Sequence, residues 1–452
     1  MTETIRIATG NGLEISLTEA ELENVRAVYA DAQNVIGGEV LYTPTQPECD
    51  EYVAIENHSP FWCRPFFGKD LRDLPELVQA LLLRRGDLYR YILPICADTW
   101  KTVIRGGKNG MEFRLYTNYD QAVDCVRQLS WVEARGRDPL ELAHRCARVA
   151  AALLGNGMKL RAERAYPEVL DYLGWCSWDA FQIRVNEAGL LEKAAEFRSK
   201  GVPIRYAILD DMWADCPKLN EIPPDTDFRT MVGFMHKSKL RSFEGDPVRF
   251  PQGMKHTVEA LKAAGIRNIG IWFPTTGYWS GVEAGGEAER EFAADLMTEP
   301  NGRRIVKPEL PHTAHWFGSL CGKAKAWGAD FVKIDNQGCQ GYYRKVGPIG
   351  KTARAVQTGI ETAVAEQMGG AVINCMGMPS ECMFNRPDSA VSRCSDDFMP
   401  ENRAWFAKHI LQCAYNGILQ GQFYVNDWDM WWTDDGQAKK NSLCRAISGG
   451  PI

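Results

Sequence analysis

Hydrophobic and polar residues alternate with a period of two through much of residues 1–138. The alternation is clear at residues 102–104 and 111–116, on either side of Asn109-Gly110. Successive side chains of a β-strand point to opposite faces, and Asn-Gly is favoured in two-residue hairpin turns. We therefore predict that residues 1–138 form an all-β, sandwich-like domain.

The apolar spacing changes to three or four residues after Pro139. This helical spacing continues to Gly155, and a glycine just past the last turn is a common helix ending. The pattern predicts one helix at this place. We interpret residues 139–170 as a helical linker between two domains.

From residue 171 onward, helical segments that end in glycine alternate with short apolar segments. Together with a first strand near residues 173–178, they predict seven strands and the opening of an eighth. Alternating strands and helices form a parallel sheet, and eight such units favour a (β/α)8 TIM barrel over a doubly wound sheet. Residues 171–452 are therefore predicted to be an α/β catalytic barrel that is incomplete at strand eight. The junctions lie at residues 200–204, 264–266, 327–331, 368–372, 416–418 and 448–452.

Composition and charge limit the classes of molecule that the protein is expected to bind. The chain has a net charge of −6 and a pI near 5.8, which argue against binding to nucleic acid or an anionic membrane. No phosphate-binding glycine motif follows a strand, no apolar run is long enough to span a membrane, and the start of the chain lacks the apolar core of a signal peptide. We expect a cytoplasmic protein with a neutral small-molecule ligand, and the sequence leaves the oligomeric state open.

The predicted fourth strand carries two charged residues in an apolar setting. Lys333 and Asp335 alternate with Val332 and Ile334, so both charges share one face of the strand. A buried charge is costly unless it is paired or used in chemistry. The two residues are therefore either a structural ion pair or part of a functional site.

Polar and aromatic residues also stand at the carboxyl ends of the other predicted strands, where the active sites of barrel enzymes lie. The mixture fits a sugar, because indole rings stack on the apolar face of a pyranose and carboxylates accept hydrogen bonds from its hydroxyls. The candidate residues are Trp175, Trp178, Asp179, Asp210, Asp211, Trp213, Trp272, Lys333, Asp335, Cys375, Arg393, Asp396, Asp397, Asp427 and Asp429.

Each part of this set also has a structural interpretation. Asp210-Asp211 is compatible with a turn or helix cap, the tryptophans with core packing, and Cys375 with an inert buried thiol. The acidic residues after strands two and seven are compatible with a divalent cation, but no Ca²⁺-loop motif is present. We favour the sugar interpretation because all seven strand ends supply suitable residues.

Seven short motifs in this region resemble one known family. They resemble the α-galactosidase and raffinose synthase group of glycoside hydrolase family 36, and within it the raffinose synthase and seed imbibition (Sip1)-like branch. Residues 61–68 also resemble the amino-terminal β domain of that branch. The motifs are Leu-Gly-Trp-Cys-Ser-Trp-Asp-Ala-Phe at 173–181, Leu-Asp-Asp-Met-Trp at 209–213, Val-Lys-Ile-Asp at 332–335, Asn-Cys-Met at 374–376, Ser-Asp-Asp-Phe at 395–398, Asn-Asp-Trp-Asp-Met-Trp at 426–431 and Arg-Ala-Ile-Ser-Gly-Gly-Pro at 445–451.

The resemblance implies a retaining mechanism in which Asp335 attacks the anomeric carbon and forms a covalent galactosyl intermediate. An aspartic acid on strand six would be the acid/base, about 5–5.5 Å from the nucleophile, and both Asp396 and Asp397 align with it. The acid/base would need a raised pKa to hold its proton. Asp210 and Asp211 would hold galactose hydroxyls.

The same resemblance implies that Trp213 and Trp272 wall the sugar pocket. Lys333 would bind the sugar, and its positive charge would keep Asp335 ionised. Asp179 and Asp429 are further, weaker correspondences. No metal or organic cofactor is implied.

We therefore expect hydrolysis of raffinose-type α-galactosides, with an oligosaccharide or small galactoside as the substrate. Galactosyl transfer to an acceptor sugar such as sucrose uses the same residues and is the alternative. The insertion at residues 216–251 is the segment expected to select between water and an acceptor. A non-catalytic, truncated sugar-binding fragment is the third hypothesis, because strand eight stops at its opening.

Overall fold

The structure is a computed structural model that describes residues 4–8, 14–35, 39–217 and 219–452. The chain forms two compact units, each assembled from segments that are far apart in the sequence. The first unit comprises Met1–Arg164, Gly338–Gln357 and Gly377–Cys444; the second comprises Ala165–Gln337, Thr358–Met376 and Arg445–Ile452. The domain boundaries expected at residues 138 and 170 stay a prediction.

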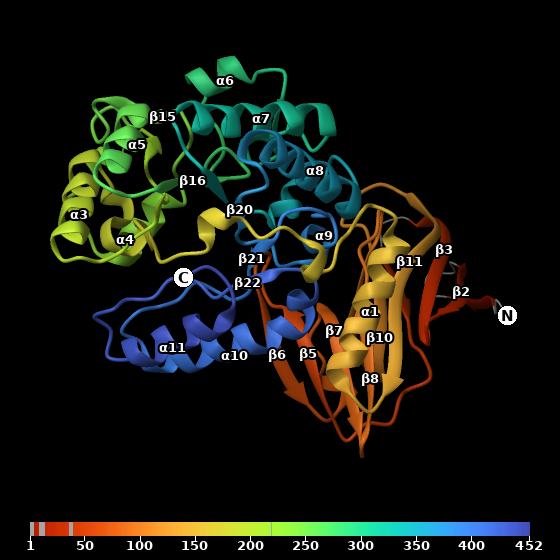
Figure 1. The fold of residues 1–452 in the computed structure, drawn as a ribbon. Coiled ribbons are helices and arrows are strands. Elements are labelled where there is room, and N and C mark those ends of the chain that lie inside the picture. The colour runs from red at the N-terminus through yellow and green to blue at the C-terminus, as the bar shows by residue number, and fades with distance from the viewer. Residues whose placement is uncertain (1–3, 9–13, 36–38, 218) are drawn as a thin grey trace. The chain divides into compact units, whose positions relative to one another are not determined.

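An antiparallel β-sheet dominates the first unit (Figure 1). Its strands are ordered β1-β2-β3-β11-β8-β7-β9-β10-β4, with β5 paired to β6 and β7. The predicted antiparallel β character of the amino-terminal region is confirmed, and its layering as a sandwich stays a prediction. The strands are β1 (Thr4–Ala8), β2 (Glu14–Leu22), β3 (Val25–Val35), β4 (Glu39–Tyr42), β5 (Glu51–Asn57), β6 (Cys63–Gly68), β7 (Val78–Arg85), β8 (Leu88–Pro94), β9 (Lys101–Gly107), β10 (Gly110–Tyr116) and β11 (Val123–Gly136).

The hairpin predicted around Asn109-Gly110 is confirmed. β9 and β10 pair antiparallel with Gly107 opposite Gly110, so the two-residue connection begins one residue earlier than predicted. The apolar side chains of these strands fill a core on one face of the sheet. In that core, Phe113 stacks on Trp131 with ring centroids 4.0 Å apart.

The predicted connecting helix is α1 (Pro139–Leu154). It begins after Asp138, whose carboxylate accepts hydrogen bonds from the backbone N–H groups of Leu140 and Glu141. It ends at Gly155 in the left-handed conformation, with a φ of 64°. The apolar face of the helix packs on β8 and β11, so α1 is part of the core of the first unit (Figure 1).

One predicted helix–strand junction, at residues 416–418, is wrong. Gly417 lies inside α10 (Arg403–Leu419), and the next strand, β22 (Val425–Asp427), begins later. A Cβ atom on Gly417 would lie 3.2 Å from Nδ2 of Asn426. Glycine therefore allows close approach of α10 to β22 and does not end the helix. β22 pairs parallel with β21 (Val391–Arg393), and the short helix α9 (Ser380–Met383) precedes β21.

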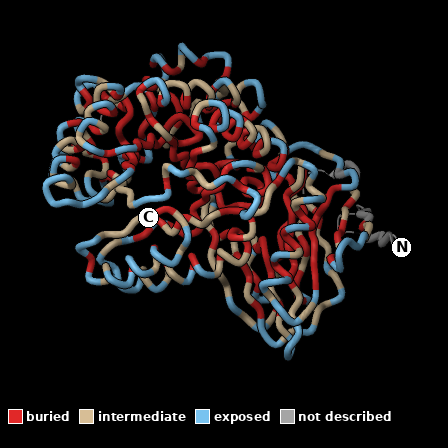
Figure 2. Tube along the Cα trace, in the orientation of Figure 1, coloured by how far each residue is buried: buried red, intermediate tan, exposed pale blue. Residues whose placement is uncertain are grey.

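A parallel sheet forms the centre of the second unit. Among the described residues of this unit, five strands pair in the order β12-β13-β16-β19-β20, each parallel to the next. Every residue of β13, β16 and β19 is buried, as expected for strands covered on both faces (Figure 2). The strands are β12 (Gly174–Cys176), β13 (Tyr206–Leu209), β16 (Asn268–Pro274), β19 (Phe331–Asp335) and β20 (Val372–Asn374).

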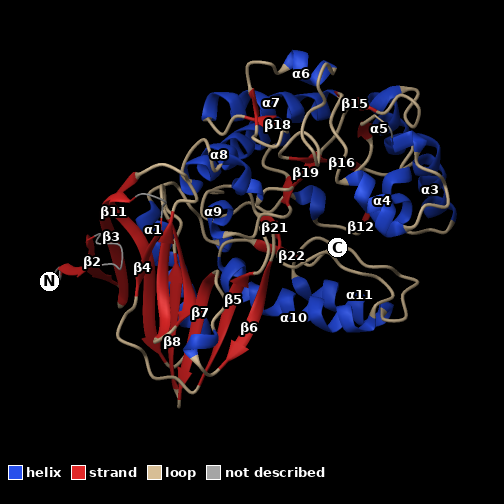
Figure 3. Ribbon diagram, turned by 180° about the vertical axis from the view of Figure 1, so that it is seen from behind, coloured by secondary structure: helices blue, strands red, loops and turns tan. Residues whose placement is uncertain are grey.

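Helices separate these parallel strands along the chain (Figure 3). The strand order follows the chain order, as in a barrel, whereas the order reverses in a doubly wound sheet. Closure as an eight-stranded barrel stays a prediction. The helices are α2 (Trp178–Phe181), α3 (Glu187–Ser199), α4 (Phe228–Met235), α5 (Gly253–Ala263), α6 (Glu287–Glu291), α7 (Leu310–Ala326), α8 (Ile349–Met368) and α11 (Ala438–Ser448). Two small antiparallel strand pairs are β14 (Ala214–Asp215) with β15 (Ser242–Gly245) and β17 (Leu296–Thr298) with β18 (Arg304–Val306).

The segment expected to open strand eight lies beside β12. The carbonyl oxygen of Ile452 accepts a hydrogen bond from the backbone N–H of Gly174 at 2.6 Å and another from the Tyr206 hydroxyl at 3.1 Å. Ile452 therefore lies beside the start of β12 and β13. In the part of the chain that the structure describes, no helix combines the length and the apolar character needed to cross a bilayer.

Candidate active site

Asp335 ends β19, and both of its carboxylate oxygens accept hydrogen bonds. The indole N–H of Trp272 on the adjacent strand β16 donates to Oδ2 at 3.0 Å, and the backbone N–H of Asn336 donates to Oδ1 at 2.8 Å. The residue is only 7% exposed. Two neutral donors therefore fix the orientation of a buried carboxylate without forming an ion pair with it.

Lys333, two residues earlier on β19, pairs with Asp210 at the end of β13. Its Nζ lies 2.7 Å from Oδ2 of Asp210, and both side chains are buried. Burial alone would lower the pKa of Lys333, but the Asp210 carboxylate raises it well above its ordinary value, with smaller contributions from Cys176, Cys375 and Asp335. The ion-pair partner of Lys333 is therefore Asp210, and its electrostatic attraction to Asp335 is weaker.

Asp210 also contacts the end of β12. The thiol of Cys176 lies 3.3 Å from Oδ2 of Asp210, and the backbone N–H of Asp210 donates to Oγ of Ser177 at 2.9 Å. Burial and the negative charge of Asp210 raise the pKa of the Cys176 thiol well above its ordinary value. Cys176 is therefore a neutral thiol that donates to Asp210.

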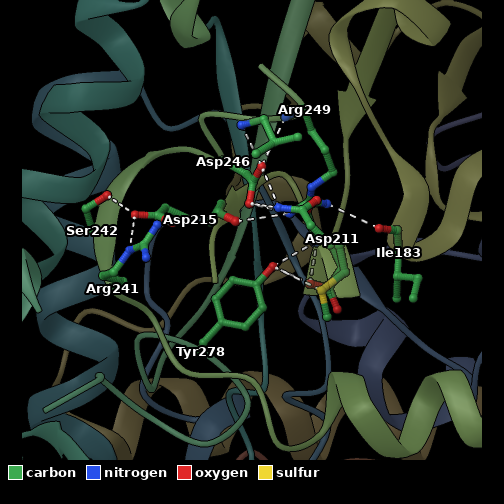
Figure 4. A network of polar contacts seen from close by, with 12 residues as sticks. Ile183, Asp211, Asp215, Arg241, Ser242, Asp246, Arg249 and Tyr278 are labelled. Atoms are coloured by element: carbon green, nitrogen blue, oxygen red, sulfur yellow. Dashed lines mark hydrogen bonds and ion pairs between the residues drawn. The ribbon is translucent and has the colours of Figure 1, made fainter. Parts of the chain in front are cut away.

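Asp211 is buried among neutral donors. The hydroxyl of Tyr278 donates to Oδ1 at 2.7 Å (Figure 4), and the indole N–H of Trp279 donates to Oδ2 at 2.6 Å. Burial raises the pKa of Asp211 to about 7; the bonds from Tyr278 and Trp279 oppose this rise, and the charge of Asp210 adds to it. The carboxyl group of Asp211 therefore exchanges its proton near neutral pH.

The insertion after β13 supports the turn that carries Asp211. Arg249 donates to the backbone carbonyl of Met212 and, at 3.2 Å, to that of Ile183, and it pairs with Asp246 at 3.5 Å (Figure 4). Met212 has a φ of 76°, in the left-handed region that L side chains rarely adopt. Arg249 therefore fixes the carbonyl of a strained turn, and it also lines a cavity of about 580 Å³ between the insertion and the start of α3.

The predicted tryptophans have different surroundings. Trp272 contacts Asp335, whereas Trp213 is buried, donates its indole N–H to the backbone carbonyl of Trp272 at 2.6 Å and packs edge-to-face on Trp327. Trp175 packs on two phenylalanine rings, with centroids 6.0 and 5.6 Å from its own. Within the described residues, Trp272 is the one of these three tryptophans that donates a hydrogen bond to a predicted catalytic carboxylate.

Three further predicted residues have simpler settings. Trp178 and Asp179 are partly buried in the short helix α2, which follows β12. Cys375 is buried directly after β20, and its backbone N–H donates to the carbonyl of Ile334 at 2.9 Å. Cys375 also makes a small contribution to the raised pKa of Lys333.

Asp396 follows β21 in the first unit and faces two basic side chains. Its Oδ1 lies 3.3 Å from Nε2 of His58 and its Oδ2 lies 3.8 Å from Nζ of Lys408, while its backbone N–H donates to Oε1 of Gln412 at 3.0 Å. Burial raises the pKa of Asp396, but the contacts with His58, Gln412 and Lys408 outweigh burial and lower it below its ordinary value. A strand-six acid/base was expected to have a raised pKa, and the pKa of Asp396 is shifted in the opposite direction.

Asp397 has a much more exposed side chain, at 70%, and pairs with Nη2 of Arg393 at 2.7 Å. The guanidinium of Arg393 is buried, also pairs with Asp429 at 2.8 Å, and lies over the ring of Trp62. The backbone N–H of Asp429 donates to Oδ1 of Asp427 at 2.8 Å. Asp397, Asp427 and Asp429 are therefore linked through Arg393 and the backbone of Asp429.

The structure places ten of the fifteen predicted site residues in two groups, one in each unit. In the part of the chain that the structure describes, no three His, Cys, Asp or Glu side chains are arranged to hold a metal ion. The strand-four group of the second unit contains Asp210, Asp211, Trp272, Lys333 and Asp335, and the strand-six group of the first unit contains Arg393, Asp396, Asp397, Asp427 and Asp429.

Sequence reasoning missed several residues that contact these groups. Tyr278 and Trp279 follow β16 by a few residues, so extending the search past the strand end would have found them. Cys176 lies between Trp175 and Trp178 in the motif at residues 173–181, where only the tryptophans and Asp179 were candidates. His58 lies on the loop between β5 and β6, and nothing in the local sequence connects it with a strand more than three hundred residues away.

The sequence profile of the family described as "Raffinose synthase or seed imbibition protein Sip1" matches residues 48–452. The "Galactinol--sucrose galactosyltransferase" of Oryza sativa subsp. japonica is 25% identical over 461 residues, covering 89% of this chain and 57% of the rice protein. The protein of the same description from Pisum sativum is 24% identical over 450 residues, covering 89% of this chain and 56% of the pea protein. The chain thus spans a little over half the length of these curated relatives.

Solved structures share the fold at low sequence identity. The α-galactosidase TtGalA from Thermus thermophilus, in complex with stachyose, superposes with a TM-score of 0.64 at 15% identity, covering 99% of this chain and 94% of that chain. The galactosidase domain of the α-galactosidase-sucrose kinase AgaSK gives a TM-score of 0.54 at 12% identity, covering 93% of this chain and 59% of that chain. At such identities the likeness concerns the fold.

Proposed function

Because the chain belongs to the family of raffinose synthases and seed imbibition proteins, we propose that it cleaves α-galactosides with retention of configuration. Asp335 is the nucleophile and Asp396 the acid/base. The C1–O bond of the galactoside breaks as an oxygen of Asp335 bonds to C1, and the departing oxygen takes a proton from Asp396. Water or an acceptor hydroxyl then attacks C1, returns a proton to Asp396 and releases Asp335 as a carboxylate.

The observation that carries the proposal is the environment of Asp335. A nucleophilic carboxylate has to be ionised, oriented and free to attack, and Trp272 and Asn336 orient Asp335 with neutral hydrogen bonds alone. The nearby cation Lys333 is already paired with Asp210. The Asp335 carboxylate is therefore oriented without an ion pair, which leaves it available to bond to the anomeric carbon, where positive charge develops in the transition state.

Asp396 is the better candidate for the acid/base of the two adjacent aspartates. Its side chain is 12% exposed and contacts a titratable residue, His58. The Asp397 side chain is 70% exposed and paired with Arg393, whose guanidinium always carries its proton and cannot exchange it. A proton-transfer group benefits from partial burial, because water then competes less for its proton.

The proposed nucleophile is tested by substitution and by covalent trapping. Asp335→Asn should lower the turnover of an aryl α-galactoside by more than about 10³-fold, because the amide cannot form the glycosyl ester. A fluorinated galactosyl fluoride should trap the intermediate, and peptide mass spectrometry should find the sugar on Asp335. Asp330→Asn, just before the same strand, is the matched control and should retain most of the activity, because Asp330 pairs with Lys262 away from the carboxyl end of the strand. Full activity of Asp335→Asn, or a label elsewhere, would refute the assignment.

Galactosyl transfer is the second candidate, and it is favoured by the relatives described as galactinol–sucrose galactosyltransferases. The same two carboxyl groups serve transfer and hydrolysis, and the products differ only in what attacks the intermediate. Incubation with galactinol in the presence and absence of sucrose should separate the two. A trisaccharide product that increases with sucrose concentration supports transfer, whereas free galactose alone at high sucrose supports hydrolysis. Sugar binding without any turnover would indicate a non-catalytic protein.

A further inference from the structure

One face of α10 presents three side chains to Asp396 and Asp397. Trp405, Lys408 and Gln412 are spaced by three and four residues, so they lie on the same side of the helix. The indole N–H of Trp405 donates to the backbone carbonyl of Asp397 at 2.8 Å. Oε1 of Gln412 accepts the backbone N–H of Asp396 at 3.0 Å. Two of the three side chains therefore fix the backbone of the aspartate pair.

Lys408 is the third side chain, and within the described residues its ammonium group donates no hydrogen bond to the protein. Its Nζ lies 3.9 Å from the ring centroid of Trp405 and 3.8 Å from Oδ2 of Asp396, which is beyond hydrogen-bond distance. The side chain is 40% exposed. The indole face and the carboxylate thus attract the ammonium group and leave its three N–H donors for solvent or a ligand.

The ammonium group lies beside the proposed acid/base. An acid catalyst has to reach the departing oxygen within hydrogen-bond distance, so the leaving group is bound directly at the Asp396 carboxylate. A donor 3.8 Å from Oδ2 of this carboxylate can therefore reach a hydroxyl of the same leaving group. The candidates for binding galactose belong to the strand-four group around Asp335. The sugar that remains for Lys408 is the leaving group.

We propose that Lys408 is a substrate-binding residue that donates a hydrogen bond to a hydroxyl of the leaving-group sugar, and that Trp405 positions its ammonium group. The inference rests on the proposed function and names the part of the substrate that α10 recognises. The ligand class is a polyhydroxylated leaving group, such as the sucrose portion of raffinose. In galactosyl transfer the acceptor sugar takes the place of the leaving group and uses the same contact.

The first test compares two donors that differ in the leaving group alone. Lys408→Met keeps an unbranched side chain and removes its N–H donors. It should lower kcat/KM for raffinose by about 10-fold or more, the loss expected for one hydrogen bond to a charged group. α-Galactosyl fluoride has no leaving-group hydroxyl, and its kcat/KM should change by less than about 3-fold. Trp405→Leu should separate the two donors in the same direction, because the ammonium group loses the ring that positions it.

The sign of the electrostatic effect distinguishes sugar binding from an effect on the acid/base. Burial raises the pKa of Asp396, whereas His58 and, more weakly, Lys408 lower it. Removing Lys408 therefore helps Asp396 to hold the proton that it donates, so a role through charge alone predicts no loss on raffinose. Lys440→Met is the matched control, because Lys440 lies 4.9 Å from the ring centroid of Phe406, which is also on α10. It should leave both donors unchanged.

A third measurement does not depend on turnover. Sucrose is not an α-galactoside, so calorimetry with sucrose measures binding alone. Its Kd should rise by about 10-fold or more in Lys408→Met and stay unchanged in Lys440→Met. Equal activity losses on both donors, an unchanged Kd or no binding of sucrose by the wild type would overturn the role of Lys408 and leave the proposed function intact. Absence of wild-type turnover on both donors would overturn the proposed function, and the Kd for sucrose would then decide by itself whether Lys408 binds the sugar.

Discussion

Two adjacent aspartate pairs, one in each unit, show how the same dipeptide acquires different chemistry. In the second unit Asp210 is paired with Lys333, and burial raises the pKa of Asp211 to about 7 despite the hydrogen bonds that it accepts from neutral donors. In the first unit Asp396 faces His58 and Lys408, which lower its pKa, and Asp397 is mostly exposed. The identity of the residue therefore says little about its protonation, because partners and burial decide it.

The comparison also separates two uses of positive charge. Lys333 is buried and closely paired, so its charge mainly neutralises the buried carboxylate of Asp210. His58 and Lys408 lie 3.3 and 3.8 Å from Asp396, beyond the 2.7–2.9 Å range that is usual for a tight charge-assisted hydrogen bond. The first arrangement is one close ion pair, whereas the second consists of longer contacts that together lower the pKa of Asp396.

The largest expected effect separates Asp396 from Asp397. Asp396→Asn should lower kcat/KM for a sugar leaving group by about 10²- to 10⁴-fold, the range that general acid–base catalysis contributes. Asp397→Asn removes the exposed partner of Arg393, which keeps its pair with the buried Asp429, and should lower the free energy of unfolding by less than about 1 kcal/mol. Steady-state kinetics on raffinose and thermal unfolding check both results. Loss of activity in Asp397→Asn alone would reverse the assignment.

The next effect concerns the Lys333–Asp210 pair. Lys333→Met leaves the Asp210 carboxylate buried without its cation and should lower the free energy of unfolding by about 3–5 kcal/mol. Lys262→Met, which breaks the partly exposed pair with Asp330, is the matched control and should cost about 1 kcal/mol or less. Urea unfolding of the two variants provides the measurement. Similar losses in both would mean that the burial of Asp210 does not determine the cost.

The smallest expected effect is the pH dependence caused by Asp211. The folded protein holds this proton up to a pKa of about 7, whereas the unfolded chain releases it near 3.8, so the native state binds more protons in between. The resulting stabilisation is fully present below pH 3.8 and is lost as the pH rises to 7 and above, with an upper limit of about 4 kcal/mol. Asp211→Asn mimics the protonated acid, so its stability relative to wild type should increase from pH 4 to pH 8. A difference independent of pH would show that Asp211 is ionised throughout.

Much of the local structure followed from the order of residues alone. The apolar spacing after Pro139 and the glycine at 155 placed α1, and the junction predicted at residues 200–204 lies directly before β13. The wrong junction predicted at Gly417 has a physical cause. This glycine allows close packing on β22, whereas the prediction took it for a glycine that ends a helix. The residues next to a glycine do not show whether it ends a helix or allows close packing against a distant strand.

The sequence by itself determined which residues stand at the ends of the parallel strands. The short apolar segments and the glycines that end the preceding helices indicate where each strand begins and stops. It therefore supplied Asp210, Asp335 and Asp396 as candidates. Only the tertiary structure decided their partners: Lys333 pairs with Asp210, Trp272 orients Asp335, and a loop of the amino-terminal sheet brings His58 to Asp396. These contacts join segments far apart in the chain, and packing of distant elements, unlike strand periodicity, leaves no local pattern.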